Sequence, residues 1–92
     1  MKITEAIKKY NLPNPTTPED LECRFQKVLN YADKVLLAGY FYNGLGKPCW
    51  FGAVYEYLDE GEHDCESTIG LYAASGIEFD DAGHAIEWAL KQ

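Results

Sequence analysis

Residues 35–58 read VLLAGYFYNGLGKPCWFGAVYEYL. Two runs rich in aliphatic and aromatic residues flank the turn sequence Asn43–Gly46, where Asn and Gly tolerate the backbone angles of a tight turn. Pro48 opens the second run, and the first position of a strand tolerates its missing N–H. The stretch therefore predicts a β-hairpin with strands over residues 35–42 and 48–58.

Both faces of this hairpin are apolar. The first strand carries Val35, Leu37 and Phe41 on one face and Leu36, Tyr40 and Tyr42 on the other. The second strand divides in the same way into two sets, namely Cys49, Phe51, Ala53, Tyr55 and Tyr57, and Trp50, Val54 and Leu58. An antiparallel sheet with one solvated face normally alternates apolar and polar residues. Two arrangements are therefore open: helices cover both faces, or one aromatic face is left for a partner.

A short helix is predicted before the hairpin, over about residues 4–11. Apolar residues recur at helical spacing from Ile3 to Tyr10, and Thr4 is a suitable cap. Pro13 and Pro15 follow, which indicates a rigid, extended connector.

A second, longer helix is predicted over residues 18–33. Thr17 is a natural N-cap, Pro18 stands at the first helical position, and acidic residues follow in the first turn. One face of this segment then collects the apolar residues at helical spacing, which are Leu21, Phe25, Val28, Leu29 and Ala32.

The sequence predicts one further strand and one helix after the hairpin. Residues 68–73 fit a strand by the alternation of Ile69 and Leu71, although a helical turn is also compatible with them. Asp80 or Asp81 can cap a final helix. Its broad apolar face comprises Ala82, Ala85, Ile86, Ala89 and Leu90. This order of elements predicts a single α+β domain over residues 1–92, with a small antiparallel sheet, two N-terminal helices and one C-terminal helix.

The charge is strongly asymmetric along the chain. The 92 residues include 8 Lys and Arg against 15 Asp and Glu, a formal net charge of −7. Residues 1–46 hold six basic and five acidic residues, whereas residues 47–92 hold two basic and ten acidic residues. A negative field disfavours direct binding to a nucleic-acid backbone or to an anionic membrane. The acidic half is therefore expected to serve a basic partner or solubility alone.

The expected location is the cytosol of a host cell. No apolar run approaches the roughly 20 residues of a membrane span. The N-terminus shows no hydrophobic signal region. The three cysteines, Cys23, Cys49 and Cys65, form no CxxC pair and are expected to be reduced thiols.

Motifs that carry chemistry do not emerge from the sequence. The acidic segment fails the calcium-loop pattern, because the third and sixth positions counted from Asp59 are Gly61 and Asp64. His63 and Cys65, with His84, leave a metal-dependent enzyme open as the weakest alternative. The prediction is a protein that is not an enzyme, with no catalytic residues, no metal site and no cofactor.

The strongest functional signal is a run of acids interleaved with aromatics after the second hairpin strand. Carboxylates can stand where phosphates bind, and tyrosine rings can fill apolar slots at a contact centre. The candidate partner-binding residues are Tyr55, Glu56, Tyr57, Asp59, Glu60, Glu62, Asp64 and Glu66. The expected partner is a basic nucleic-acid-binding protein, and a homodimer through the aromatic sheet face is also possible.

In size, acidity, aromatic content and reduced cysteines, and in the Glu56–Glu66 stretch, the chain resembles small phage- or plasmid-encoded anti-defence proteins of the anti-CRISPR and antirestriction type. This resemblance implies a non-catalytic inhibitor that occupies the nucleic-acid-binding groove of a nuclease, such as a CRISPR effector. An immunity protein for a nuclease toxin and a homodimeric accessory domain remain as alternatives.

Overall fold

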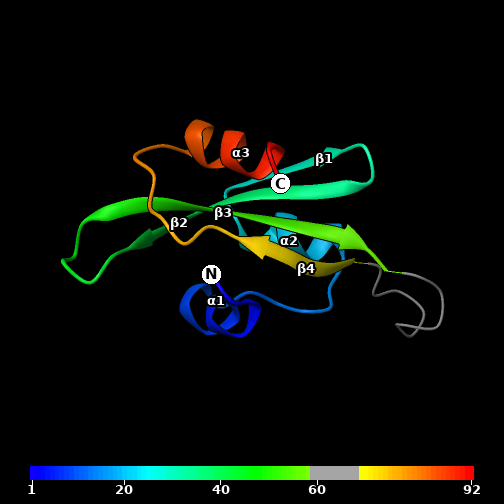
Figure 1. Cartoon of the computed structure of the whole chain (residues 1–92), viewed down its shortest axis with the longest axis horizontal. Helices are drawn as coiled ribbons and strands as arrows, with labels where there is room; N and C mark the ends of the chain where they lie inside the picture. The colour runs from blue at the N-terminus through cyan, green and yellow to red at the C-terminus, as the bar shows by residue number, and fades with distance from the viewer. Residues whose placement is uncertain (59–68) are drawn as a thin grey trace.

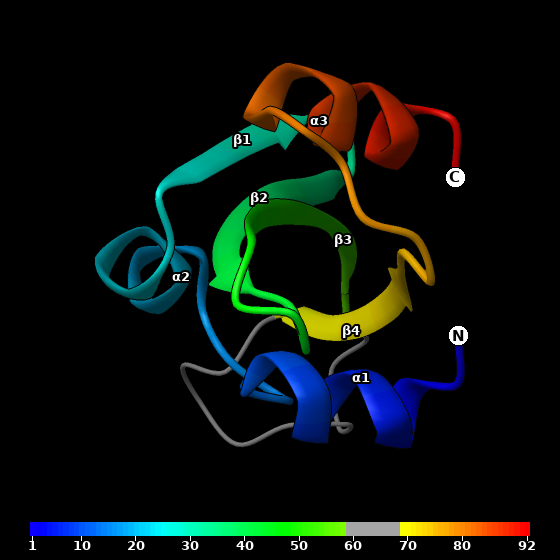
Figure 2. The ribbon, with the colours of Figure 1, turned by 90° about the vertical axis from the view of Figure 1, so that its left-hand side faces the viewer.

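The computed structural model of the chain describes residues 1–58 and 69–92. Its elements in chain order are α1 (Ile3–Tyr10), α2 (Pro18–Arg24), β1 (Lys27–Tyr31), β2 (Lys34–Tyr42), β3 (Pro48–Tyr57), β4 (Ile69–Ala74) and α3 (Ala82–Leu90). The strands form one antiparallel sheet in the order β1-β2-β3-β4. Helices α1 and α2 pack on one face and α3 on the other (Figures 1 and 2). The predicted α+β class is confirmed.

The predicted β2–β3 hairpin forms with its expected turn. Tyr40 pairs with Trp50 near the tip. In the turn, Oδ1 of Asn43 accepts hydrogen bonds from the backbone N–H groups of Leu45 (2.9 Å) and Lys47 (3.0 Å), and Gly46 has a φ of 77°. A positive φ favours glycine, so the turn residues suit their conformation.

The prediction of a single helix over residues 18–33 is wrong in its second half. Helix α2 ends at Arg24, Phe25 is extended (φ −122°, ψ 155°), and β1 pairs with β2 through a tight turn in which Ala32 has a φ of 55°. The apolar spacing that fitted a helix places Phe25 and Val28 against the core in the strand arrangement as well. The sheet therefore has four strands, one more than expected.

Strand β1 pairs with β2 because the second edge of β2 needs hydrogen-bond partners. Nine residues long and largely buried, β2 would leave a row of buried backbone N–H and C=O groups without partners along its second edge. Strand β1 supplies those partners, and the side-chain Oε1 of Gln26 accepts a further hydrogen bond from the Tyr40 N–H (2.9 Å). A tertiary requirement has overridden a local helical pattern.

The other predicted elements are confirmed with small shifts. Strand β4 matches the predicted third strand, and the extended segment around Thr16 bridges to its Ile69. Thr4 lies within α1, whose N-cap position is Lys2 and has no side-chain cap. Helix α3 begins after Asp81, which caps it through the His84 N–H (2.8 Å). Leu90 is exposed, so the buried face of α3 is narrower than predicted.

The first face of the sheet holds the larger core. Phe51 is at its centre, with the Tyr10 ring stacked on it at 3.9 Å between centroids. The buried members are Ala6, Tyr10, Leu12, Leu21, Val35, Leu37, Phe51, Ala53, Tyr55, Ile69 and Ala74. On the opposite face, α3 closes a smaller cluster of Leu36, Ala38, Val54, Ala85, Ile86 and Ala89. Of the two arrangements left open by the sequence, helices therefore cover the central part of both faces.

Helix α3 lies unusually close to the sheet at Gly52. A Cβ atom at position 52 would lie 2.6 Å from the Ala85 carbonyl oxygen and 3.0 Å from Cε3 of Trp88. Glycine at this position thus sets the distance between α3 and β3. None of the described helices is long and apolar enough to cross a membrane.

Candidate partner-binding site

The structure describes three of the eight predicted partner-binding residues. Glu56 and Tyr57 are exposed at the end of β3. Tyr55 is instead fully buried in the larger core. The other five, Asp59, Glu60, Glu62, Asp64 and Glu66, lie outside the described residues.

Tyr55 has a structural position rather than a surface one. Its hydroxyl donates a hydrogen bond of 2.8 Å to the Pro13 carbonyl oxygen, which ties the proline connector to β3. Burial raises the pKa of Tyr55, so the phenol stays a donor. The alternation of aromatic and acidic residues did not distinguish this inward ring from its exposed neighbour Tyr57.

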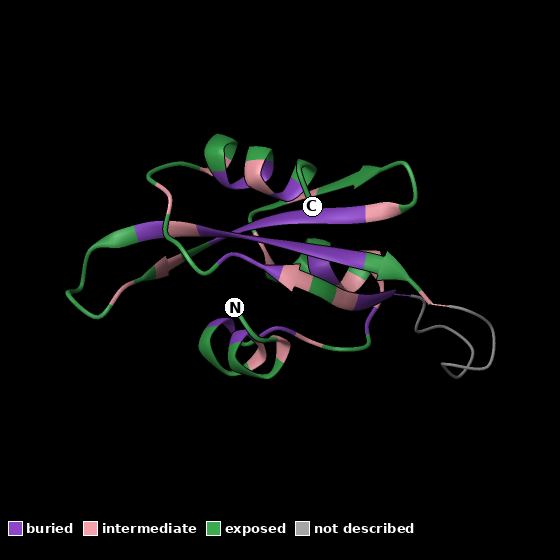
Figure 3. Ribbon diagram, viewed as in Figure 1, coloured by how far each residue is buried: buried purple, intermediate pink, exposed green. Residues whose placement is uncertain are grey.

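The most exposed apolar side chains in the described chain lie at the tip of the β2–β3 hairpin. Leu45 is 92% exposed and Tyr42 is 66% exposed, and Tyr40 is also exposed. Figure 3 shows this end of the hairpin as exposed, while the central parts of β2 and β3 are buried. We refer to Tyr40, Tyr42, Leu45 and Trp50 as the tip surface.

The tip surface is held in one arrangement by local contacts. The Tyr40 ring makes edge-to-face contacts with Tyr42 (centroids 5.7 Å apart) and with Trp50 (5.3 Å). The Asn43 side chain organises the turn and also donates a hydrogen bond of 3.2 Å to Oε1 of Glu78. Exposed rings that are already fixed lose little conformational entropy when they bind a partner.

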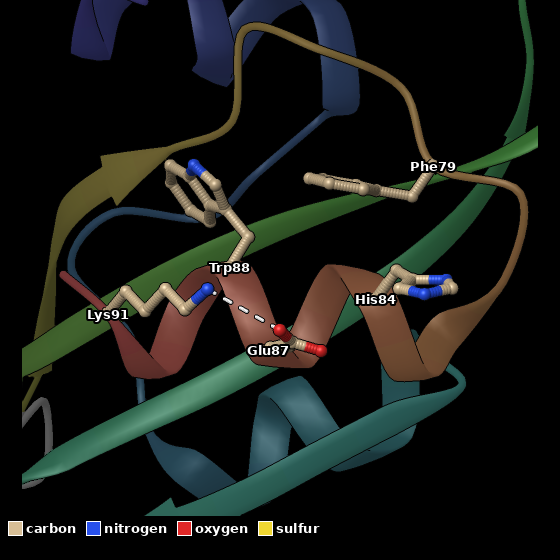
Figure 4. Close-up of a pocket in the computed structure, with 5 residues that line it drawn as sticks. All are labelled: Phe79, His84, Glu87, Trp88 and Lys91. Carbon is tan, nitrogen blue, oxygen red and sulfur yellow. Dashed lines mark hydrogen bonds and ion pairs between the residues drawn. The ribbon is translucent and has the colours of Figure 1, made fainter.

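A pocket lies next to the tip surface, on the α3 face. The backbone N–H of Trp50 donates to the Phe79 carbonyl oxygen, and the Phe79 N–H donates to the Trp50 carbonyl oxygen (2.9 Å each). The two residues therefore lie opposite each other. From Phe79 the aromatic surface continues to α3. Figure 4 shows the open pocket, which has a volume of about 230 Å³ and is lined by Phe79, His84, Glu87, Trp88 and Lys91.

Two cysteines, Cys23 and Cys49, and one histidine, His84, lie among the described residues. Cys49 is buried, and burial raises the pKa of its thiol, which disfavours the reactive thiolate. His84 pairs with Asp81 (2.8 Å), while its proposed co-ligands His63 and Cys65 lie outside the described residues. Within residues 1–58 and 69–92, no group of three or more His, Cys, Asp or Glu side chains could hold a metal ion.

The hairpin sequence contains the tip aromatics but does not distinguish them from its other apolar residues. The pattern places Tyr40 and Tyr42 on one apolar face, and the turn that exposes Leu45 follows from Asn43 and its glycines. Phe79 was missed because its pairing with Trp50 joins segments far apart in the sequence. Only a prediction of that long-range contact would have found the pocket.

One protein family matches the chain. The model of the family described as nucleotide modification associated domain 4 matches residues 12–92. The chain belongs to this family. No curated protein and no solved structure shows significant similarity. The nucleotide modification associated domain 4 match includes the whole tip surface and the pocket, whereas α1 precedes it.

Proposed function

We propose that the chain is a small non-catalytic binding protein that docks on an enzyme acting on nucleotides or nucleic acid. Its target is a basic nucleic-acid-binding groove, and occupation of that groove keeps nucleic acid out. A nuclease such as a CRISPR effector and a nucleotide-modifying enzyme both present such a groove. The observation that carries the proposal is the tip surface, where a fixed turn holds Leu45 and Tyr42 in solvent.

The tip surface has the composition of a protein-binding hot spot. Tyrosine and tryptophan dominate the binding energy at protein interfaces, particularly where they lie at the centre of a contact. Three aromatic rings from two strands contact each other at the tip, with Leu45 projecting beside them. Exposed apolar residues in one place on a small domain commonly mark an interaction site.

The net negative charge of the chain supports a basic partner. Glu78 is tied to the turn by Asn43, and Asp80 and Asp81 follow it along the chain. The chain as a whole carries a formal charge of −7. A negative protein meets a positive groove faster than a neutral one does, and salt weakens that attraction. Membership of a family associated with nucleotide modification is consistent with a partner that handles nucleotides.

Binding to a panel of purified nucleases and nucleotide-modifying enzymes, measured at low and high salt, tests this proposal. We expect one partner to bind, with an affinity that falls as salt rises. The double change Tyr42→Ala and Leu45→Ala should weaken that binding by tenfold or more, since hot-spot residues cost about 2 kcal/mol or more each. Tyr31→Ala is the matched control, because Tyr31 is 55% exposed but lies on β1.

Charge reversal tests whether electrostatic attraction contributes to the binding. Replacing the exposed Glu78 and Asp80 with Lys should lower both the affinity and its dependence on salt, because Glu78 is bonded to the turn and Asp80 follows it closely. Equal losses in the tip variant and the Tyr31 control would contradict a specific docking surface. Light scattering that shows a dimer, dissociated by Tyr40→Lys, would instead assign the tip surface to self-association.

A further inference from the structure

The pocket on the α3 face has two aromatic walls that are fixed in place. Phe79 is held by its two backbone hydrogen bonds to Trp50. Trp88 packs over Gly52, where its ring would lie 3.0 Å from an added Cβ. Both rings are only partly buried, so each has a face or edge in contact with solvent. Aromatic walls of this kind favour a flat, aromatic ligand.

The polar side chains of the pocket can form hydrogen bonds with the edge of such a ligand. The His84 Nδ1 lies 2.8 Å from the Asp81 carboxylate, which can only accept, so Nδ1 donates this hydrogen bond and Nε2 is the ring nitrogen left for a ligand. The Glu87 carboxylate adds acceptors and the Lys91 ammonium adds donors (Figure 4). The pocket therefore offers both kinds of hydrogen-bonding group, as the edges of a heterocyclic base require.

The charges of the pocket argue for an uncharged ligand. Lys91 Nζ lies 3.4 Å from Oε1 of Glu87, and His84 is paired with Asp81. The Lys91 ammonium thus already faces a carboxylate, the His84 imidazole donates to another, and Glu78 and Asp80 flank Phe79 in the sequence. A phosphate group would meet no free positive charge among these residues. The negative surroundings would also repel a nucleic-acid strand.

We propose that this pocket binds the heterocyclic base of a nucleoside against Phe79 and Trp88, with its polar edge towards His84, Glu87 and Lys91. The volume of about 230 Å³ is below the ~300–1,000 Å³ of sites for drug-sized ligands and suits a base better than a whole dinucleotide. A family associated with nucleotide modification makes a nucleobase the most relevant flat heterocycle. This site is independent of docking by the tip surface.

Titration of the full chain with adenosine and with cytidine, followed by ¹H–¹⁵N NMR, tests the site. The chain has two tryptophans, so the two indole N–H signals can be assigned by substitution. We expect at least one nucleoside to shift the Trp88 signal and the α3 amides in a saturable manner. Absence of saturable shifts with both nucleosides at millimolar concentration would overturn the proposal.

Variants separate stacking from a merely structural effect. Trp88→Leu and Phe79→Leu should each weaken binding about fivefold or more, since stacking on a base is worth ~1–3 kcal/mol. Trp88→Phe should retain most of the affinity because it keeps a ring. Tyr72→Leu, an exposed tyrosine on β4, is the matched control. Equal binding by all four variants, with dispersed spectra that show a folded chain, would overturn the stacking geometry.

Comparison of adenosine with AMP and with a short single-stranded oligonucleotide tests whether the bound base belongs to a nucleoside, a nucleotide or a nucleic-acid strand. The paired charges predict that adenosine binds at least as tightly as AMP. Binding of the oligonucleotide alone, or AMP binding more than fivefold tighter than adenosine, would overturn the assignment of an uncharged ligand.

Discussion

The two faces of the sheet are built on the same strands but differ in where their aromatic rings lie. On the α1 and α2 face, Phe51 is buried at the centre, stacked on Tyr10 and contacted edge-on by Phe25 and Phe41. On the α3 face the buried residues are all aliphatic. The aromatic residues of that face, Trp50, Phe79 and Trp88, lie at its margin and are partly exposed.

The difference follows from how closely the helices approach. Helix α3 contributes Ala85, Ile86 and Ala89 to the buried cluster and meets β3 at Gly52, so its backbone lies close to the strand and the Trp88 ring packs beside this contact. The rings of that face are therefore displaced to the rim, where they can contact ligands or partners. A tightly packed, small-residue helix can in this way leave binding groups exposed beside it.

The largest loss of stability is expected from substituting Phe51 on β3, and a much smaller loss from substituting its neighbour Trp50. Phe51 and Trp50 are neighbours that point to opposite faces. Phe51→Ala should cost about 3–5 kcal/mol in the free energy of unfolding, because it empties the centre of a close-packed core. Trp50→Ala should cost less than half as much, because its ring is partly solvated. Urea unfolding of the two variants measures the difference, and equal losses would contradict the two-face comparison.

The close approach of α3 can be tested with one methyl group. Gly52→Ala should destabilise the fold by about 1–3 kcal/mol, since its Cβ would collide with the Ala85 carbonyl oxygen and force the helix away. Gly44→Ala is the matched control, because no neighbouring atom lies within 4 Å of a Cβ built there. A stable Gly52→Ala variant with unchanged tryptophan fluorescence would show that α3 is not fixed by this contact.

A smaller effect concerns the hydrogen bond that joins α1 to the loop after β4. The Tyr10 hydroxyl donates to the buried Ser75 carbonyl oxygen at 3.2 Å, and Ser75 also bonds Gly52 through its N–H and its hydroxyl. Tyr10→Phe keeps the stacked ring and removes only this bond, so we expect a loss of about 0.5–1.5 kcal/mol in thermal or urea unfolding. Tyr72→Phe, on the other face and exposed, should change nothing measurable.

The sequence was sufficient for the parts of the fold that depend on local signals. The turn residues Asn43–Gly46 predicted the hairpin, and Asp80 or Asp81 as a cap predicted the start of α3. The helix predicted over residues 18–33 failed because its second half is held by β2. Apolar spacing in that segment fits both a helix and a strand. The strand forms because the edge of β2 needs hydrogen-bond partners.

The tip surface could not be located from the sequence. It is aromatic, as the hairpin sequence indicates, but it contains none of the eight residues predicted to bind a partner. Tyr55, however, entered the core because the register of β3 turns it towards Pro13. The pocket needed the bridge between Trp50 and Phe79, a contact that no local pattern encodes.

The smallest effect on stability concerns two carboxylates at helix N-termini, one on each face: Asp20 in the first turn of α2 and Asp81 at the N-cap of α3. The Thr16 hydroxyl and then Arg24 lower the pKa of Asp20, and the His84 backbone N–H lowers that of Asp81. A carboxyl whose pKa is lower in the folded chain stabilises it above the unfolded value of about 3.8. That contribution is lost as the pH falls through the folded value, so stability should decline in this acid range.

Asp20→Asn and Asp81→Asn should each flatten the decline in urea unfolding measured from pH 6 to pH 2.5. Because both tryptophans lie on the α3 face, Asp81→Asn should also alter the acid response of tryptophan fluorescence, whereas Asp20→Asn should not. Curves parallel to the parent in both variants would show that these hydrogen bonds do not stabilise either carboxylate in the folded chain.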